Sequence, residues 1–305
     1  MVTLPPSPES PTVYLITETA IDSGARDLLE TGIAALAAGP CAIENLTVGP
    51  SLGERDRAEI LEFLQDAYNA RGALVIGPAQ AFFDDAPGTY DEIEAACHLL
   101  GEVGIIRRVP GALHAAAPRL TACTRAANRI LPAETTEVLI LGAGPDARAL
   151  AAALASNMCH ALPAKVTLAS NNALGLNIAR HRLKDATAES RLEIRHVQSV
   201  SEYDRLLALL PPDSAVIQAL GPTEADMTQA GSATLFPMGS VIWDTRSDAS
   251  KSRFLAAAVR QRDAARLTLS DQTAFRTERD IAILEALFAE PGDETMQTKL
   301  RKAIT

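Results

Sequence analysis

The fold is decided by a glycine-rich stretch near the middle of the chain, Val138-Leu-Ile-Leu-Gly-Ala-Gly-Pro-Asp-Ala147. It joins an apolar run, 137–141, to an alanine-rich run, 145–159, which is typical of a helix. Gly142 permits a tight turn between the two, and Gly144 lets a ligand approach the backbone closely. The stretch therefore predicts a strand, a tight turn and a helix, in the order that characterises a dinucleotide-binding turn.

The first helical residues after the turn also favour an anionic ligand. Pro145 suits the first helical position, and Ala147 in place of a third glycine still allows close helix–strand packing. The helix N-terminus offers N–H groups and a positive dipole end to phosphate. Asp146 opposes this, unless it points away or Arg148 offsets its charge. We expect the cofactor to contact Gly142, Ala143, Gly144, Pro145, Asp146 and Ala147.

Strand and helix patterns alternate through the second half of the chain. Apolar runs at 137–141, 165–169, 192–195, 214–218, 240–244 and 266–269 predict six strands, with helical patterns between them. This alternation predicts a Rossmann-type, doubly wound parallel sheet over residues 136–275. At the end of the second strand, Ser170-Asn171-Asn172 carries neither the acidic residue that binds NAD nor an arginine for NADP. Asn171 and Asn172 are expected cofactor contacts, and the choice between NAD and NADP is open.

The first half alternates in the same way and predicts a separate α/β domain over residues 12–120. Strands are expected at 12–17, 41–48, 72–77 and 103–106, in a largely parallel sheet, with a helix at 92–100. A proline-rich lead-in, 1–11, is expected to be disordered. A connecting helix is expected within 121–135, and a C-terminal helical segment over 276–305. The predicted architecture is therefore two α/β domains.

The composition of the chain limits the kinds of molecule that it is expected to bind. A net charge of −10 and a pI near 5.1 argue against nucleic acid and anionic membranes, which repel an acidic protein. No signal peptide or membrane-spanning run is recognised, and the four scattered cysteines are typical of reduced thiols in a cytoplasmic protein. The dispersed histidines predict no metal site. A small-molecule substrate is expected, and a homodimer is compatible with the sequence.

The order of these parts resembles the shikimate/quinate dehydrogenase family. The segments that carry the resemblance are Gly72-Ala-Leu-Val75, Leu99-Leu-Gly-Glu-Val-Gly-Ile-Ile106, Pro110-Gly-Ala-Leu113, Phe236-Pro-Met-Gly-Ser-Val-Ile-Trp243 and Phe254-Leu-Ala-Ala-Ala258. The resemblance implies an N-terminal substrate domain, a Rossmann domain and a C-terminal helix that returns to the first domain. It also implies cofactor contacts at Leu220 and Gly221, where the family has Asn-Ala-Thr-Gly.

The family's catalytic residues do not carry over. Its lysine falls at Ala79 and its partner aspartate near Pro118-Arg119, so the Lys–Asp mechanism is not expected. Candidate replacements as acid or base are His114, which titrates near working pH, and Glu102. Each is also explained by a structural role.

Three further residues are candidates for substrate binding. Ser23 is what is left of the family's substrate loop, and Gln80 and Asp244 could hydrogen-bond a ligand. Asp244 could equally cap the following helix. The sequence thus predicts a divergent NAD(P)-dependent oxidoreductase acting on a small carbonyl, alcohol or imine. Two alternatives stay open: a non-catalytic nucleotide- or metabolite-binding relative, and a lyase or isomerase that reuses the cleft.

Overall fold

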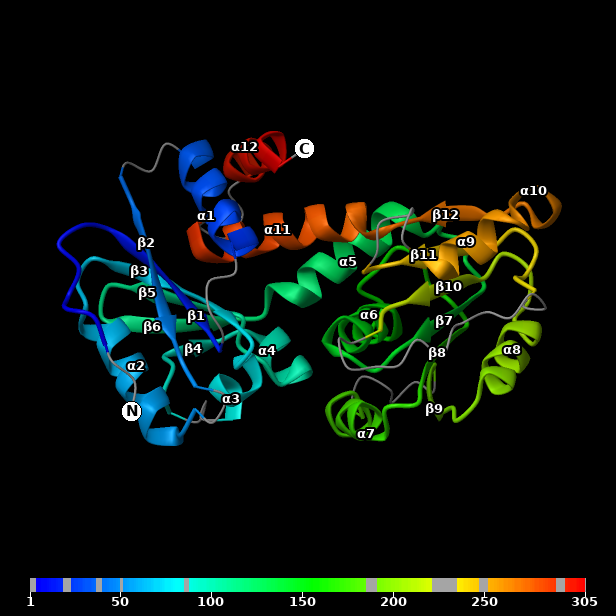
Figure 1. Cartoon of the computed structure of the whole chain (residues 1–305), viewed down its shortest axis with the longest axis horizontal. Helices are drawn as coiled ribbons and strands as arrows, with labels where there is room; N and C mark the ends of the chain where they lie inside the picture. Colours follow the sequence, from blue (N-terminus) through cyan, green and yellow to red (C-terminus); the bar gives the residue numbers. More distant parts are fainter. Residues whose placement is uncertain are drawn as a thin grey trace. The chain divides into compact units, whose positions relative to one another are not determined.

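The chain folds into two compact units in the computed structural model (Figure 1). The first comprises residues 1–119 and 279–305, and the second residues 120–278. The chain passes between the units within helix α5 (Pro118–Ile130) and helix α11 (Gln272–Phe288). The structure describes residues 4–18, 23–36, 40–49, 52–84, 88–184, 191–220, 235–246, 252–288 and 294–304.

The second unit contains a six-stranded sheet in the order β12-β11-β10-β7-β8-β9, with every neighbouring pair parallel. Numbered from its own first strand this is the order 3-2-1-4-5-6, read from β9, which defines the doubly wound Rossmann sheet. The strands are β7 (Glu137–Leu141), β8 (Lys165–Ser170), β9 (Leu192–His196), β10 (Ala215–Gln218), β11 (Val241–Asp244) and β12 (Thr268–Ser270). The predicted six-strand Rossmann domain is confirmed.

Helices cover this sheet because its strands are apolar on both faces. On one face Leu139, Val216 and Ile242 pack against Tyr203 and Phe254. The helices of this unit besides α5 are α6 (Pro145–Ala155), α7 (Ala173–Arg182), α8 (Val200–Ala208), α9 (Arg253–Val259) and α10 (Arg262–Ala265). Helix α6 is buried along almost its whole length, because its alanines allow close approach to the sheet.

The sheet of the first unit is mixed, with the order β2-β1-β3-β5-β6-β4. Its strands are β1 (Thr12–Thr17), β2 (Ala42–Thr47), β3 (Ala70–Ile76), β4 (Glu92–Ile93), β5 (Ile105–Val109) and β6 (Ala112–Ala116). Strand β5 is antiparallel to both β3 and β6, and the other pairs are parallel. The sheet is therefore parallel-rich, as expected, with β5 as its antiparallel strand.

The antiparallel pairing of β5 with β6 arises at Pro110-Gly111. Gly111, with φ of 79°, forms the turn of a β5–β6 hairpin. Strand β6 is alanine-rich, and alanine has a low preference for strands, which is why the sequence did not predict it. The helix expected from Glu92 begins later, as α4 (Ala95–Leu100), because Glu92–Ile93 pairs with β6.

The C-terminal helices complete the core of the first unit, as expected. Val13 and Leu15 of β1 pack with Leu284 and Leu287 of α11 and with Leu300 of α12 (Glu294–Ile304). Figure 1 shows α1 (Ser23–Leu36), the second half of α11 and α12 together on one side of this sheet. The remaining helices of this unit are α2 (Glu54–Asp66) and α3 (Ala79–Asp84).

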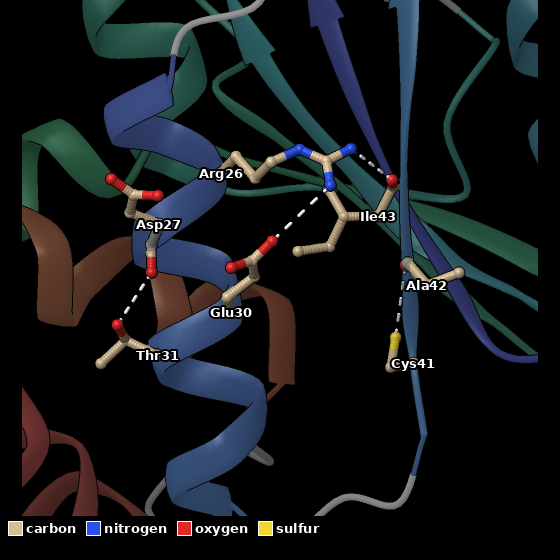
Figure 2. A network of polar contacts seen from close by, with 7 residues as sticks. All are labelled: Arg26, Asp27, Glu30, Thr31, Cys41, Ala42 and Ile43. Carbon is tan, nitrogen blue, oxygen red and sulfur yellow. Dashed lines mark hydrogen bonds and ion pairs between the residues drawn. The ribbon is translucent and has the colours of Figure 1, made fainter.

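Helix α1 also contacts the edge strand β2 through polar groups (Figure 2). The Arg26 guanidinium donates a 2.8 Å hydrogen bond to the carbonyl oxygen of Ile43 and lies 3.6 Å from the Glu30 carboxylate. This contact holds the helix over the strand and occupies a backbone acceptor of β2, which lies at the edge of the sheet. No helix in the described part of the chain has the length and apolar character that crossing a membrane requires.

Candidate functional site

The glycine turn lies where β7 ends, beside the strand β10, at the point where the strand order of the sheet reverses. Gly142 has a φ of 125°, a conformation that L side chains rarely adopt. A Cβ atom there would overlap the carbonyl oxygen of Ala219, which follows β10. Two chain segments therefore meet at backbone distance, at the place where open α/β sheets bind their ligands.

The helix that follows begins with a glycine N-cap. Gly144 is extended, with φ of −66° and ψ of 175°, and Pro145 occupies the first turn of α6. Since a glycine cap has no side chain, it cannot occupy the first amide groups of the helix as Ser or Asp would. Ala147 is fully buried, as close packing of α6 requires. The start of α6 thus has the form of an anion-binding helix end.

The guanidinium of Arg148 returns to the turn and donates a 2.9 Å hydrogen bond from Nη1 to the carbonyl oxygen of Ala143. Its positive charge therefore lies at the turn itself. The Cys123 thiol contacts the backbone carbonyl oxygen of Asp146 at 3.8 Å. A positive charge is thus present in the turn that also contains Asp146, which sequence reasoning identified as unfavourable for phosphate.

The polar residues after β8 hold helix α7 in place. Asn172 caps this helix by accepting a 2.9 Å hydrogen bond from the Gly175 amide, and the Ser170 hydroxyl oxygen accepts one of 3.0 Å from the Asn172 amide. Gly175 lies against the glycine turn, since a Cβ there would be 2.8 Å from the Ala143 carbonyl oxygen. Sequence reasoning missed Gly175, although an isolated glycine inside a helical pattern is a signal of close backbone approach.

Asp244, at the end of β11, is fully buried and belongs to a hydrogen-bond network. Its carboxylate accepts hydrogen bonds from the Ser252 hydroxyl at 2.6 Å, the Arg246 amide at 2.9 Å and the Gln218 side-chain amide at 3.3 Å. Ser252 in turn caps α9. Arg246 also donates to the carbonyl oxygen of Leu220 at 3.1 Å, whereas Gly221 lies outside the described residues. Of the two roles considered for Asp244, this network favours the structural one.

In the first unit, an ion pair joins Glu102 and Arg119 close to the backbone of Ala79. The Val103 amide donates a 2.9 Å hydrogen bond to the carbonyl oxygen of Ala79. The neighbouring Glu102 is 6% exposed, and its carboxylate forms a 2.7 Å ion pair with Arg119. The structure therefore gives Glu102 a structural partner.

The other candidate residues of this unit lie on different elements, and no contact among the described residues joins them. His114 is on β6, with its Nδ1 atom 3.1 Å from the Glu92 carboxylate. Gln80 is exposed on α3. Ser23 is the first residue of α1, and the structure does not describe its side chain. Among the described residues no three His, Cys, Asp or Glu side chains are grouped to hold a metal ion.

No protein-family model matches the sequence, and a search of curated proteins found no match. Solved structures do match. The quinate dehydrogenase from Corynebacterium glutamicum, in complex with NAD, is 18% identical with a TM-score of 0.72, covering 96% of this chain and 98% of that one.

Two further structures match over nearly their whole lengths. The 5-ketofructose reductase of Gluconobacter sp. is 19% identical (TM-score 0.68), covering 97% of this chain and 99% of that one. The Thermus thermophilus shikimate dehydrogenase, in complex with NADP(H) and shikimate, is 15% identical (TM-score 0.62), covering 96% and 99%. This chain therefore has the fold of the shikimate and quinate dehydrogenases.

Proposed function

We propose that this protein is an NAD(P)-dependent oxidoreductase that acts on a small carbonyl, alcohol or imine. The observation that carries the proposal is the glycine turn at the reversal point of the second unit's sheet, with its backbone-to-backbone approach at Gly142 and Ala219. Solved proteins of the same fold hold NAD or NADP(H). When bound, the nicotinamide supplies the hydride transfer.

The residues present fit such a cofactor. Gly142 and Gly144 bring bare backbone to the start of α6, whose N-terminal amides and dipole favour a pyrophosphate. Arg148 adds a positive charge at the turn, where its guanidinium donates to the carbonyl oxygen of Ala143. The residues proposed to contact the cofactor are Gly142, Ala143, Gly144, Pro145, Asp146, Ala147, Asn171, Asn172, Leu220 and Gly221.

The choice between NAD and NADP has a specific physical basis here. The Asn172 side chain is engaged in capping α7, which leaves Asn171 as the residue at the end of β8 whose amide can contact the ribose. A neutral amide can donate a hydrogen bond to a hydroxyl or to a phosphate oxygen. We therefore propose weak discrimination between the two cofactors, in contrast to sites that use an acidic residue or an arginine.

The substrate is proposed to carry few hydroxyl groups. Alanine stands at the position of the family's lysine, and Glu102 is held by Arg119 rather than offered to a polyol. A site built to hydrogen-bond several hydroxyls loses affinity steeply when its partners are missing. His114 is the proposed proton donor, because imidazole is a common general acid or base and its Nδ1 atom is held 3.1 Å from the Glu92 carboxylate. Glu102, Ser23, Gln80 and Asp244 are weaker candidates for the site.

The decisive experiment is titration of the purified full chain with NADH and with NADPH, followed by nicotinamide fluorescence. Gly144→Asp should abolish binding by placing a carboxylate at the phosphate position. Gly53→Asp is a matched control, since Gly53 is also an extended helix N-cap, with φ of −73° and ψ of 160°, and a Cβ there would make only an ordinary 3.6 Å contact with the Asp56 carboxylate. No binding of either nucleotide at about millimolar concentration would overturn the proposal.

A second function, a non-catalytic nucleotide- or metabolite-binding protein, is favoured by what the resemblance implies. It places the family's lysine at Ala79 and its aspartate near Arg119, which is salt-bridged to Glu102. If NADH or NADPH binds, and no carbonyl, imine or alcohol from a broad panel changes its absorbance at 340 nm under any pH from about 6 to 9, this second function replaces the first. A lyase or isomerase would show turnover of a substrate without that absorbance change.

We also propose that the protein works in the cytoplasm. All four cysteines lie in the described part of the chain and none forms a disulfide, which is the usual state of thiols in a reducing compartment. Dimerisation is proposed as well, and light scattering at two protein concentrations tests it. A monomer mass at both concentrations would contradict it.

A further inference from the structure

The first unit contains a cavity of about 500 Å³ at the end of its sheet where β3 begins and β5 ends. Three arginines line it, Arg71, Arg107 and Arg108, and an apolar wall is formed by Leu287, Phe288 and Met296. We call this the arginine pocket. Its lining includes no carboxylate, in a chain whose net charge is −10. A cavity of this volume is in the range that small organic ligands occupy.

Arg71 is directed by an irregularity of the sheet. Thr12 of β1 pairs with Ala70, but the next residue, Val13, pairs with Gly72, so that Arg71 is an extra residue in β3. Gly72 has a φ of 148°, and a Cβ there would overlap the carbonyl oxygen of Ile106. Bulges of this kind are rare between parallel strands and commonly re-aim a side chain next to a site.

The three guanidinium groups differ in how they are held. Arg108 donates hydrogen bonds to the carbonyl oxygens of Gln65 (3.1 Å) and Tyr68 (3.3 Å), which fix its position. Arg107 interacts with Glu94. The guanidinium of Arg71 makes no hydrogen bond or ion pair with any part of the chain that the structure describes. Its five N–H donors can therefore bind a ligand.

Cys41, at the edge of the pocket, adds no negative charge. Its thiol contacts the carbonyl oxygen of Ala42 at 3.7 Å, as Figure 2 shows. Burial raises the pKa of this thiol, and the nearby Arg71 opposes that effect only in part. The thiol is therefore neutral at neutral pH, and the positive charge of the arginines is uncompensated by it.

The apolar part of the lining favours a ligand with a hydrocarbon surface. Leu287 and Phe288 end α11 and Met296 lies on α12, so that three apolar side chains line the same pocket as the arginines. Guanidinium groups match the planar, two-oxygen geometry of a carboxylate, while an apolar wall gains free energy only from an apolar ligand surface. Inorganic phosphate would use the arginines and leave the wall in contact with water.

We propose that the arginine pocket binds a small organic acid whose carboxylate contacts Arg71 and whose aromatic or branched apolar body lies against Phe288 and Met296. The pocket belongs to the first unit, and the glycine turn belongs to the second. It is thus a second ligand site, independent of the proposed nucleotide site.

The test is calorimetric titration of the full-length protein with 3-phenylpropionate, and separately with 3-phenyl-1-propanol and inorganic phosphate. The carboxylate with a ring should bind at least about tenfold more tightly than either probe that lacks one of the two parts. Equal binding of the alcohol would mean an apolar pocket only, and equal binding of phosphate a cationic patch only. Either result overturns the proposal, as does absence of phenylpropionate binding at about 10 mM.

Variants locate the site. Arg71→Met should weaken phenylpropionate binding about tenfold or more while keeping the stem of the side chain. Arg55→Met removes the same charge from a highly exposed surface site and should leave binding unchanged. Met296→Glu, which places a carboxylate on the apolar wall, should abolish it. Unchanged binding in Arg71→Met would place the ligand elsewhere.

Two readouts separate this site from the nucleotide site. Phenylpropionate should slow alkylation of Cys41, which lines the pocket, without slowing that of the other cysteines. Gly144→Asp should bind phenylpropionate normally, so that loss of nucleotide binding and loss of acid binding can be told apart. Unprotected Cys41 at saturating phenylpropionate would contradict the assignment.

Discussion

The backbones at Gly142 and Ala219 are so close that no side chain fits between them. A Cβ atom at Gly142 would lie 2.8 Å from the Ala219 carbonyl carbon and closer still to its oxygen. The φ of 125° at Gly142 adds a second constraint, because an L residue is strained there. The contact joins the ends of β7 and β10, the two central strands of the second unit's sheet.

Gly142→Ala should therefore destabilise the second unit by about 2 kcal/mol or more, from backbone strain and displacement of the β10 end. Urea unfolding followed by the fluorescence of Trp243, the only tryptophan and a buried residue of β11, measures this. Gly144→Ala, in the same turn with an ordinary φ of −66°, should cost less than about 1 kcal/mol. Equal losses in the two variants would contradict this account.

Ser252→Ala should cost about 1–2 kcal/mol, since it removes both the cap of α9 and a 2.6 Å hydrogen bond to the buried Asp244 carboxylate. Asp244→Ala should cost about 3 kcal/mol, because it leaves the buried donors of Gln218 and Ser252 and the part-buried amide of Arg246 without that acceptor. The double variant should show a coupling energy near 1 kcal/mol in the same urea assay. Strictly additive effects would show that the network is not cooperative.

Glu193→Gln should make the protein less sensitive to acid. Burial raises the pKa of Glu193, but hydrogen bonds and charge from Lys165 and Arg195 outweigh it and hold the pKa below its usual value. A carboxyl with a lowered folded-state pKa stabilises the protein above its unfolded-state value and loses that contribution as the pH falls. The stability difference between wild type and Glu193→Gln should thus shrink between about pH 6 and pH 3. A constant difference over this range would refute the assignment.

Alkylation by iodoacetamide at pH 8 should modify Cys41 first. Burial raises the pKa of Cys97 to about 12, with Glu94 and Glu102 contributing, and that of Cys159 to about 11, so few thiolates form at these sites. Cys41 is only half-buried. Peptide mass spectrometry over time measures the order, and rapid labelling of Cys97 in the native protein would contradict it. Full labelling after unfolding in urea is the control.

Much of the second unit could be predicted because local signals agree there. Each strand is a short apolar run bounded by turn residues, and the turn from Gly142 to Ala147 directly follows one of them. In the first unit, β6 was missed because its alanines resemble helix formers, and pairing with β5 decides its structure. The bulge at Arg71 depends on the register between β1 and β3, which a single strand's residues do not specify.

Only the backbone part of the candidate site, the glycine turn, could be predicted from the sequence. The spacing of the glycines at 142 and 144 predicts a tight turn from the sequence alone. A polar side chain can have several hydrogen-bond partners, and tertiary packing determines which one it contacts. Asn172 caps α7 and Asp244 supports the cap of α9, roles that arise from the neighbours each meets. Glu102 pairs with Arg119, which lies seventeen residues further along the chain, and no local sequence pattern predicts this ion pair.

The core of the first unit uses side chains from both ends of the chain, and this orders its assembly during synthesis. Val13, Leu15 and Leu29 are synthesised about 255 to 287 residues before the residues that cover them, Leu284, Leu287 and Leu300. In the interval the second unit, which is continuous in sequence, is synthesised whole. The nascent chain therefore carries an uncovered apolar surface until residues 284–300 have been synthesised, a state that chaperones bind and that favours aggregation when synthesis stalls.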